Sequence, residues 1–140
     1  MVYVDTSVLV ALCVNESSSA AVARWYAACD DELTAAAWCV TEFAGAMGIK
    51  QRTGQLTGDQ AAVAWSAFER LCASDLQLLP IEPSTFHRAA VLTLDATAGL
   101  RPGDALHLAA ALEAKAKSMA TLDDVLAHNA KRMKIKALTF

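Results

Sequence analysis

Short apolar runs alternate with longer stretches of helical periodicity along the whole chain. Val-Tyr-Val at positions 2–4 has the pattern of a buried strand and ends at Asp5. We expect further strands at residues 33–36, 76–81, 118–121 and 136–139. Helices are expected directly after Asp5 and at about residues 18–29, 38–51, 57–73, 83–96, 102–116 and 125–132. Strands that alternate with helices predict an α/β domain whose central sheet is mainly parallel and covered by helices on both faces.

Local signals mark the ends of several helices. Thr6 or Ser7 can cap the first helix, since a hydroxyl satisfies free backbone N–H groups there. Thr57 with Gln60 three residues later resembles a capping box. Pro83 suits the first turn of a helix, because its missing N–H would be unpaired there anyway.

Length and composition favour one folded domain over residues 1–140. The chain is 55% hydrophobic, which supports a sizeable core and argues against disorder. No apolar run reaches the roughly 18 residues that a membrane span requires. The apolar N-terminus lacks a basic region and contains Asp5, which argues against a signal peptide. We therefore expect a buried first strand and helix, and no membrane association.

The four cysteines form no Cys-x-x-Cys pair, and the three histidines are too scattered for a zinc motif. A disulfide framework is unusual in a domain this hydrophobic. We interpret the cysteines as buried thiols in a reducing cytoplasm, so a cytoplasmic location is expected. They are Cys13, Cys29, Cys39 and Cys72.

Charge is unevenly distributed although the net charge is only −3. Residues 1–114 carry six basic and thirteen acidic side chains, whereas residues 115–140 carry six basic and two acidic ones. A basic C-terminal region can attract phosphate groups. A solvated helix face explains the same pattern equally well.

Three acidic positions fall at strand ends or helix starts. Asp5 follows the first strand, and ligands gather at the carboxyl ends of parallel strands, although a helix N-cap explains this position equally well. Asp104 lies in the first turn of a helix, where the macrodipole favours an anion by about 0.3–1 kcal/mol. Asp123 and Asp124 follow the strand at 118–121, so one can cap the next helix while the other points at a site.

Glu42 lies inside a predicted helix, on the same side as Trp38 and Gly45. A carboxylate facing protein needs a partner, because burying an unpaired charge is costly. The alternative is a glutamate at the edge of an apolar face that reaches solvent. If Glu42 converges with the other acids, their repulsion must be offset by raised pKa values or by a cation. All-oxygen ligands suit Mg²⁺ or Mn²⁺, and such an ion with open water positions can cleave phosphodiesters.

Several motifs in chain order resemble the PIN domain, and more narrowly the VapC toxins of toxin–antitoxin pairs. The most specific is Leu-Arg-x-x-Asp-Ala-x-His-Leu-Ala-Ala, from Leu100 to Ala110. The others are Val4-Asp5-Thr6-Ser7, Thr41-Glu42 and Ala120-Thr121-Leu122-Asp123. The resemblance covers the whole chain and implies a Mg²⁺- or Mn²⁺-dependent endoribonuclease that cleaves structured RNA such as tRNA or rRNA.

The resemblance also implies roles for particular residues. The acidic quartet that holds the metal would be Asp5, Glu42, Asp104 and Asp123, with Asp123 preferred to Asp124 because it follows Thr-Leu directly. Thr6 and Thr121 would lie beside it as supporting hydroxyls, and Arg101 would contact RNA or anchor its loop. His107, three residues after Asp104, is interpreted as a hydrogen-bonded structural residue rather than a catalytic one. The implied partners are a second copy of the chain and a cognate antitoxin whose C-terminal segment enters the acidic groove.

Other classes fit the sequence less well. A phosphatase with an aspartate nucleophile would usually carry a second aspartate where Ser7 stands, and a phospho-receiver domain would need an acid pair near the first strand. A non-catalytic binding domain has no need of converging acids. A housekeeping RNA-processing nuclease is the remaining alternative to a toxin, and the short chain favours the toxin.

Overall fold

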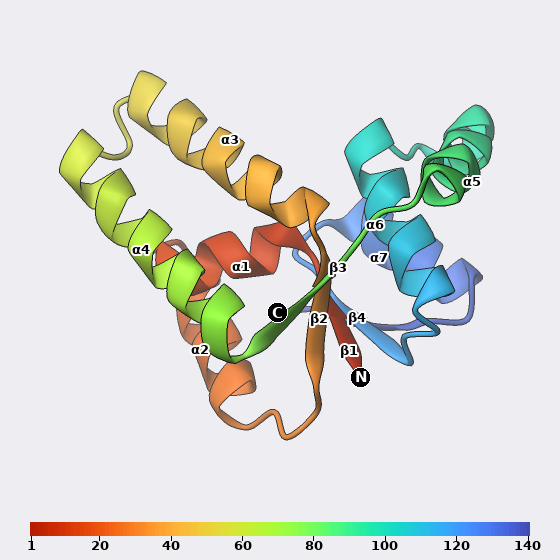
Figure 1. Ribbon diagram of the computed structural model, residues 1–140, viewed down its shortest axis with the longest axis horizontal. Coiled ribbons are helices and arrows are strands. Elements are labelled where there is room, and N and C mark those ends of the chain that lie inside the picture. Colours follow the sequence, from red (N-terminus) through yellow and green to blue (C-terminus); the bar gives the residue numbers. More distant parts are fainter.

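Five parallel strands form the central sheet of the computed structural model, which describes residues 1–140 (Figure 1). Their spatial order is β3-β2-β1-β4-β5, and every neighbouring pair is parallel. The strands are β1 (Val2–Val4), β2 (Leu33–Ala36), β3 (Leu76–Leu79), β4 (Ser118–Ala120) and β5 (Lys136–Leu138). The predicted parallel α/β sheet is therefore confirmed.

Helices cover both faces of this sheet, α1 to α4 on one side and α5 to α7 on the other (Figure 1). The first group is α1 (Thr6–Cys13), α2 (Ser19–Ala27), α3 (Trp38–Arg52) and α4 (Gly58–Ser74). The second is α5 (Pro83–Leu94), α6 (Pro102–Glu113) and α7 (Asp124–Arg132), with a 3₁₀ turn η1 (Ala96–Ala98) between α5 and α6. None of these helices has the length and apolar character of a membrane span.

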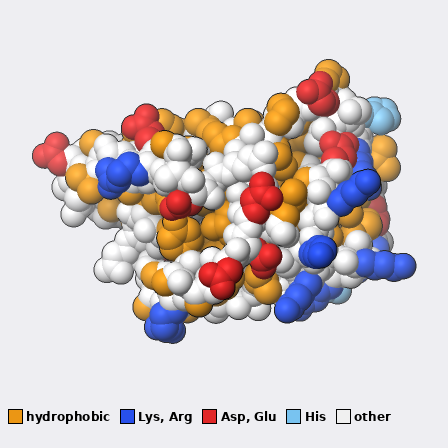
Figure 2. Space-filling model, turned by 60° about the horizontal axis from the view of Figure 1, so that its bottom comes forward, with side chains coloured by type: hydrophobic (Ala, Val, Ile, Leu, Met, Phe, Trp, Pro, Cys, Tyr) orange, Lys and Arg blue, Asp and Glu red, His pale blue; other side chains and the backbone are white.

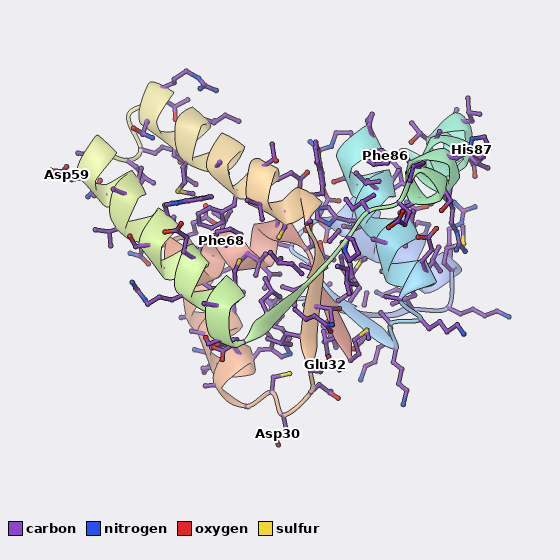
Figure 3. All side chains as sticks on the ribbon, in the orientation of Figure 1. Asp30, Glu32, Asp59, Phe68, Phe86 and His87 are labelled. Atoms are coloured by element: carbon purple, nitrogen blue, oxygen red, sulfur yellow. The ribbon has the colours of Figure 1, made fainter.

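Two hydrophobic cores result, because successive strand side chains point to opposite faces. Val2 and Val4 belong to the core under α1, α3 and α4, while Tyr3 between them belongs to the core under α6 and α7. In the first core the rings of Phe43 and Phe68 stack with their centres 4.3 Å apart, and Figure 3 shows Phe68 on the inner side of α4. Such pairs contribute about 0.5–1.5 kcal/mol beyond their buried area.

The strand order changes direction at β1. Strands β2 and β3 extend the sheet to one side of β1, and β4 and β5 extend it to the other. The backbone N–H of Asp5 donates to Ala120 O at 3.0 Å, so the residues that follow β1 and β4 meet at one point. Crevices at such switch points are the usual ligand sites of open parallel sheets.

Some local expectations are confirmed and others are wrong. The capping box of Thr57 and Gln60 is present, and Pro83 opens α5. The proposed cap of the first helix is wrong, because α1 begins at Thr6 with Asp5 at the N-cap and no side-chain cap hydrogen bond. Strand β3 ends before Pro80, which cannot donate to a strand ladder, so it is shorter than expected.

The cysteines form no disulfide, as expected. Only Cys39 is fully buried, and the other three are partly exposed. The interpretation of all four as buried thiols is therefore wrong for Cys13, Cys29 and Cys72.

Candidate active site

An open groove of about 600 Å³ lies at the carboxyl edge of the sheet, where β1 and β4 end. Five acids line it. Glu16 is paired with Lys50. The other four come from the end of β1, helix α3, the first turn of α6 and the residue before α7. These four acids are Asp5, Glu42, Asp104 and Asp123, the four that the sequence selected. Thr6 and Arg101 also line the groove, whereas Asp124 does not.

Asp5 is the most buried of these acids, with only 4% of its surface exposed. Its Oδ2 accepts hydrogen bonds from Ser7 Oγ at 2.5 Å and from Thr121 Oγ1 at 2.9 Å. Its Oδ1 accepts none. The two hydroxyls therefore fix the orientation of a buried carboxylate and leave one of its oxygens without a donor.

Glu42 is held from two directions. Its Oε2 accepts from Thr6 Oγ1 at 2.6 Å and lies 2.5 Å from His107 Nε2. The other ring nitrogen, His107 Nδ1, is 2.8 Å from the Tyr3 hydroxyl, which accepts from Ala36 N at 3.1 Å. A buried chain of hydrogen bonds thus runs from β2 through β1 and α6 to Glu42.

The charged forms of Glu42 and His107, at the end of this series of hydrogen bonds, stabilise each other. Burial disfavours ionised Glu42 and is the largest single influence, but His107 and Thr6 together outweigh it, so the pKa of Glu42 is lowered. Burial likewise disfavours the charged form of His107, yet Glu42, Asp5 and Asp104 outweigh it and raise its pKa above the ordinary 6.5. In the absence of a metal, His107 and Glu42 therefore behave as an ion pair.

Arg101 bridges the two remaining acids. It precedes Pro102, which favours an extended backbone, and it is the N-cap of α6 with φ −76° and ψ 158°. Its Nε donates to Asp104 Oδ2 at 3.0 Å and its Nη2 to Asp123 Oδ2 at 3.1 Å. Despite Arg101, the pKa of Asp104 is raised, chiefly by burial and further by repulsion from Asp123 and Asp5.

Asp123 has two tasks rather than one. Its Oδ1 accepts from Leu126 N at 2.8 Å and so caps α7, while its Oδ2 faces Arg101 across the groove. The expectation that one aspartate of the pair caps the helix while the other points at a site is therefore wrong. Asp124 is exposed in the first turn of α7 and takes neither role.

Close packing restricts the room around Glu42. A Cβ at Gly103 would lie 2.8 Å from Glu42 Oε1 and 3.4 Å from Trp38 Nε1. The Trp38 nitrogen is buried without a hydrogen-bond partner. Glycine at position 103 therefore permits the close approach of the start of α6 to Glu42 and Trp38 on α3.

The basic residues of the C-terminal region lie elsewhere. Lys117 directly precedes β4, and Lys136 begins β5, so both stand at the amino edge of the sheet, opposite the acids. Figure 2 shows Lys and Arg side chains gathered toward one end of the molecule. The cations that line the groove are instead Arg101 and Lys50, and Lys50 is paired with Glu16 at 2.6 Å.

The donor set fits a hard divalent cation. Asp5, Glu42 and His107 each offer an atom within 4.8 Å of the others, and Asp5 Oδ1, which accepts no hydrogen bond, lies 3.6 Å from His107 Nε2. The pKa of Asp104 is raised chiefly by burial and further by repulsion from Asp123 and Asp5, and a cation would relieve that repulsion. Carboxylate oxygens suit Mg²⁺ or Mn²⁺. Because His107 is bonded to Tyr3 and Glu42, it supports the carboxylates rather than completing a zinc-type ligand set.

Sequence reasoning missed two residues of this site. The sequence suggests a helix cap for Ser7 and gives it no role at the acids, but its Oγ donates to Asp5 and accepts from Leu122 N at 3.0 Å. Tyr3 was considered only as part of a strand, but its hydroxyl contacts His107. A signal for Tyr3 existed, since a tyrosine between two valines in a buried strand needs a partner for its hydroxyl.

A parallel α/β sheet with an acidic groove at its switch point is the architecture that these observations define. A family model described as PIN domain matches residues 2–132, and the chain belongs to the PIN domain family. A comparison with curated protein sequences finds no significant match.

Solved structures share this fold at low sequence identity. VapC20 of Mycobacterium tuberculosis, described as a sarcin–ricin loop cleaving toxin, aligns with a TM-score of 0.74 and 15% identity over 92% of this chain and 95% of its own. FitAcB of Neisseria gonorrhoeae aligns with a TM-score of 0.71 and 16% identity over 99% of this chain and 97% of its own. VapBC2 of Rickettsia felis was solved with a DNA fragment from its promoter. It aligns with a TM-score of 0.65 and 14% identity over 99% of this chain and 98% of its own. At these identities the likeness establishes the fold alone.

Proposed function

We propose that this protein is a divalent-metal-dependent endoribonuclease, with Mg²⁺ or Mn²⁺ held by Asp5, Glu42, Asp104 and Asp123. The observation that carries the proposal is the meeting of these four carboxylates, from four separate elements, in one open groove of about 600 Å³. Membership of the PIN domain family supports it. When bound, the ion would polarise the scissile phosphate and lower the pKa of an attacking water.

The chain's own residues would prepare the groove for this chemistry. Ser7 and Thr121 hold Asp5 in one orientation, and Thr6 and His107 do the same for Glu42. These bonds pre-organise the carboxylates, so little rearrangement is needed when a substrate arrives. Arg101, whose side chain is 76% exposed, would contact an RNA phosphate at the mouth of the groove.

We further propose that the nuclease acts in the cytoplasm as the toxin of a toxin–antitoxin pair. The motif resemblance to VapC proteins and the fold shared with VapC20 support this role. The target would be structured RNA such as tRNA or rRNA. A cognate antitoxin would block the groove with its C-terminal segment, and a cationic side chain of that segment would suit the acids.

A homodimer is part of the same proposal. Helix α5 exposes Phe86, Val91 and Leu94 by 52%, 56% and 83%, and Figure 3 shows Phe86 on that helix. An apolar hollow of about 520 Å³ lies beside them, between α5, α6 and the start of α3. Exposed apolar patches of this kind commonly mark protein interfaces. Light scattering should give twice the monomer mass, and Leu94→Glu should reduce it to the monomer mass.

The activity is tested with purified protein, structured RNA and Mn²⁺ or Mg²⁺. Asp5→Asn and Asp104→Asn should each slow cleavage about 100-fold or more while the circular dichroism spectrum stays unchanged. Asp124→Asn, outside the groove, is the matched control and should cleave like wild type. If both groove variants cleaved normally, the site would be misassigned.

Two further measurements separate the parts of the proposal. Calorimetry of wild type that detected no Mn²⁺ binding would favour a non-catalytic binding domain. Overproduction of the active enzyme should arrest growth, and overproduction of Asp5→Asn should not. Harmless overproduction of active enzyme would favour a housekeeping nuclease over a toxin.

A further inference from the structure

Arg101 occupies a position between two acids that a metal ion would also use. Its guanidinium spans Asp104 Oδ2 at 3.0 Å and Asp123 Oδ2 at 3.1 Å, so one planar group is shared by two carboxylates. The two acids are largely buried, with 15% and 24% of their side chains exposed, whereas the arginine is 76% exposed. The contact therefore joins an exposed cation to two partly buried anions.

Arg101 and a divalent cation would compete for oxygen atoms of these two acids. Asp123 Oδ1 already caps α7 by accepting from Leu126 N at 2.8 Å. Its Oδ2 is the remaining oxygen, and Arg101 Nη2 contacts it. A divalent cation that used Asp123 Oδ2 would share this oxygen with the guanidinium, a group of like charge. The two cations cannot be held there together without strong repulsion.

Arg101 is held in place by little else. Its hydrogen bonds are to Asp104 and Asp123, and its exposed stem allows other side-chain rotamers. Exposed ion pairs contribute little and are broken easily. A planar guanidinium also binds phosphate oxygens in a bidentate manner. Arg101 can therefore exchange two carboxylates for one phosphate without moving its backbone.

We propose that Arg101 is an exchangeable counter-cation: it neutralises Asp104 and Asp123 in the metal-free protein and transfers to an RNA phosphate when a divalent ion takes those acids. This inference rests on the proposed metal-dependent cleavage of RNA. Arg101 would then affect metal binding and RNA binding in opposite directions. It weakens metal binding in the absence of RNA, and it strengthens RNA binding once the metal is in place.

Calorimetry of Mn²⁺ binding tests the first half. Arg101→Gln should bind Mn²⁺ about three- to tenfold more tightly than wild type, the size expected from two partly exposed ion pairs. Arg101→Lys should fall between them, because a lysine is a point charge that cannot bridge both acids with a fork. Arg88→Gln removes the same charge from an exposed position on α5 and should bind Mn²⁺ like wild type.

Steady-state cleavage of a structured RNA tests the second half. Arg101→Gln should raise KM about tenfold at saturating Mn²⁺, and the dependence of log KM on log salt should weaken by about one phosphate contact. Arg88→Gln should change neither.

The outcomes are distinct. Tighter Mn²⁺ binding together with weaker RNA binding supports the exchange. Unchanged or weaker Mn²⁺ binding by Arg101→Gln overturns it, since the arginine would then position the acids rather than compete for them. Tighter Mn²⁺ binding with unchanged KM overturns the transfer to phosphate. If neither wild type nor Arg101→Gln bound Mn²⁺, the proposed metal site would itself be wrong, and this inference with it.

Discussion

His107 Nε2 lies 2.5 Å from Glu42 Oε2, so the buried face of α6 is joined directly to an acid of the groove. The His107 side chain is 1% exposed and that of Glu42 is 25% exposed. The buried imidazole therefore fixes the orientation of a carboxylate that is partly exposed to solvent.

Replacing His107 with leucine should destabilise the protein by about 2–4 kcal/mol. The substitution keeps an apolar volume but leaves the Tyr3 hydroxyl and Glu42 without their shared partner. An unsatisfied buried polar group costs about 1–3 kcal/mol. Urea denaturation in the presence of a chelator measures the loss. His87→Ala changes an exposed histidine on α5 (Figure 3) and should stay within about 0.5 kcal/mol of wild type.

The His107–Glu42 pair also predicts how the stability of the metal-free protein depends on pH. The pKa of His107 is raised, so its contribution is complete below about pH 6.5 and is lost as the pH rises through the folded-state pKa. The pKa of Glu42 is lowered, so its contribution is present above about pH 4.5 and is lost as the pH falls through its folded-state pKa.

The free energy of unfolding contributed by this pair should therefore be greatest between about pH 4.5 and pH 6.5 and decline above that window. Asp104 acts in the same direction, because its raised pKa penalises the charged form that dominates at higher pH. Urea midpoints measured from pH 5 to pH 9 with a chelator present should show the decline, and His107→Gln should flatten it. An equally steep decline in His107→Gln would assign the effect to other groups.

The fold could be predicted from the sequence because each strand is a short apolar run and each helix has its own periodicity. Val2 to Val4 has no alternation of polar residues, which is typical of a strand covered on both faces. Asp5, Asp104 and Asp123 could be selected because their positions at strand ends and helix starts do not depend on tertiary contacts. The meeting of Asp5 and Asp123 follows from parallel topology, since the carboxyl ends of β1 and β4 share one edge. Asp104 opens α6, which follows another helix rather than a strand, so its place depends on how α6 packs.

The hydrogen-bond partners could not be predicted in the same way. Ser7 is a candidate cap for the free N–H groups of its own helix, but its Oγ donates to Asp5 and accepts from the backbone N–H of Leu122, which follows β4. Tyr3 and His107 are 104 positions apart, and their contact exists only because α6 packs on the face of β1 that carries Tyr3. A hydroxyl has several possible partners, and tertiary packing selects among them.

Gly103→Ala should disturb Glu42 without unfolding the protein. The new methyl group would lie 2.8 Å from Glu42 Oε1, so the carboxylate must shift, although Thr6 and His107 hold its other oxygen. We expect an activity loss of about tenfold to 100-fold, as for small misplacements of catalytic groups. Cleavage of structured RNA at saturating Mn²⁺ measures it.

Gly45→Ala is the matched control for this substitution. Gly45 also lines the groove, but a Cβ there would meet nothing within 4 Å. Because alanine is the better helix former by about 1 kcal/mol, this variant should be more stable than wild type and should retain its metal affinity. If Gly103→Ala and Gly45→Ala lost equal cleavage activity, crowding of Glu42 would not be the cause.

The two roles of Asp123 can be separated by substitution. Asparagine caps a helix about as well as aspartate, so Asp123→Asn should leave the free energy of unfolding within about 0.5 kcal/mol of wild type. It removes the negative charge from Oδ2, however, and should weaken Mn²⁺ binding about tenfold or more. Asp123→Ala should show the same weakening together with a loss of about 1 kcal/mol for the missing cap.

Asp124→Asn decides whether the assignment of the fourth acid is correct. Asp124 is exposed and lies outside the groove, so its substitution should leave the Mn²⁺ affinity measured by calorimetry unchanged. The free energy of unfolding should fall by no more than about 1 kcal/mol, because the first turn of α7 loses an anion. If Asp124→Asn lost Mn²⁺ binding while Asp123→Asn kept it, Asp124 would be the metal ligand. Asp123 would then serve only as the cap of α7 and as the partner of Arg101. The loss of Mn²⁺ binding in Asp123→Asn alone would instead assign both the cap and the ligand to one carboxylate, with a different oxygen for each.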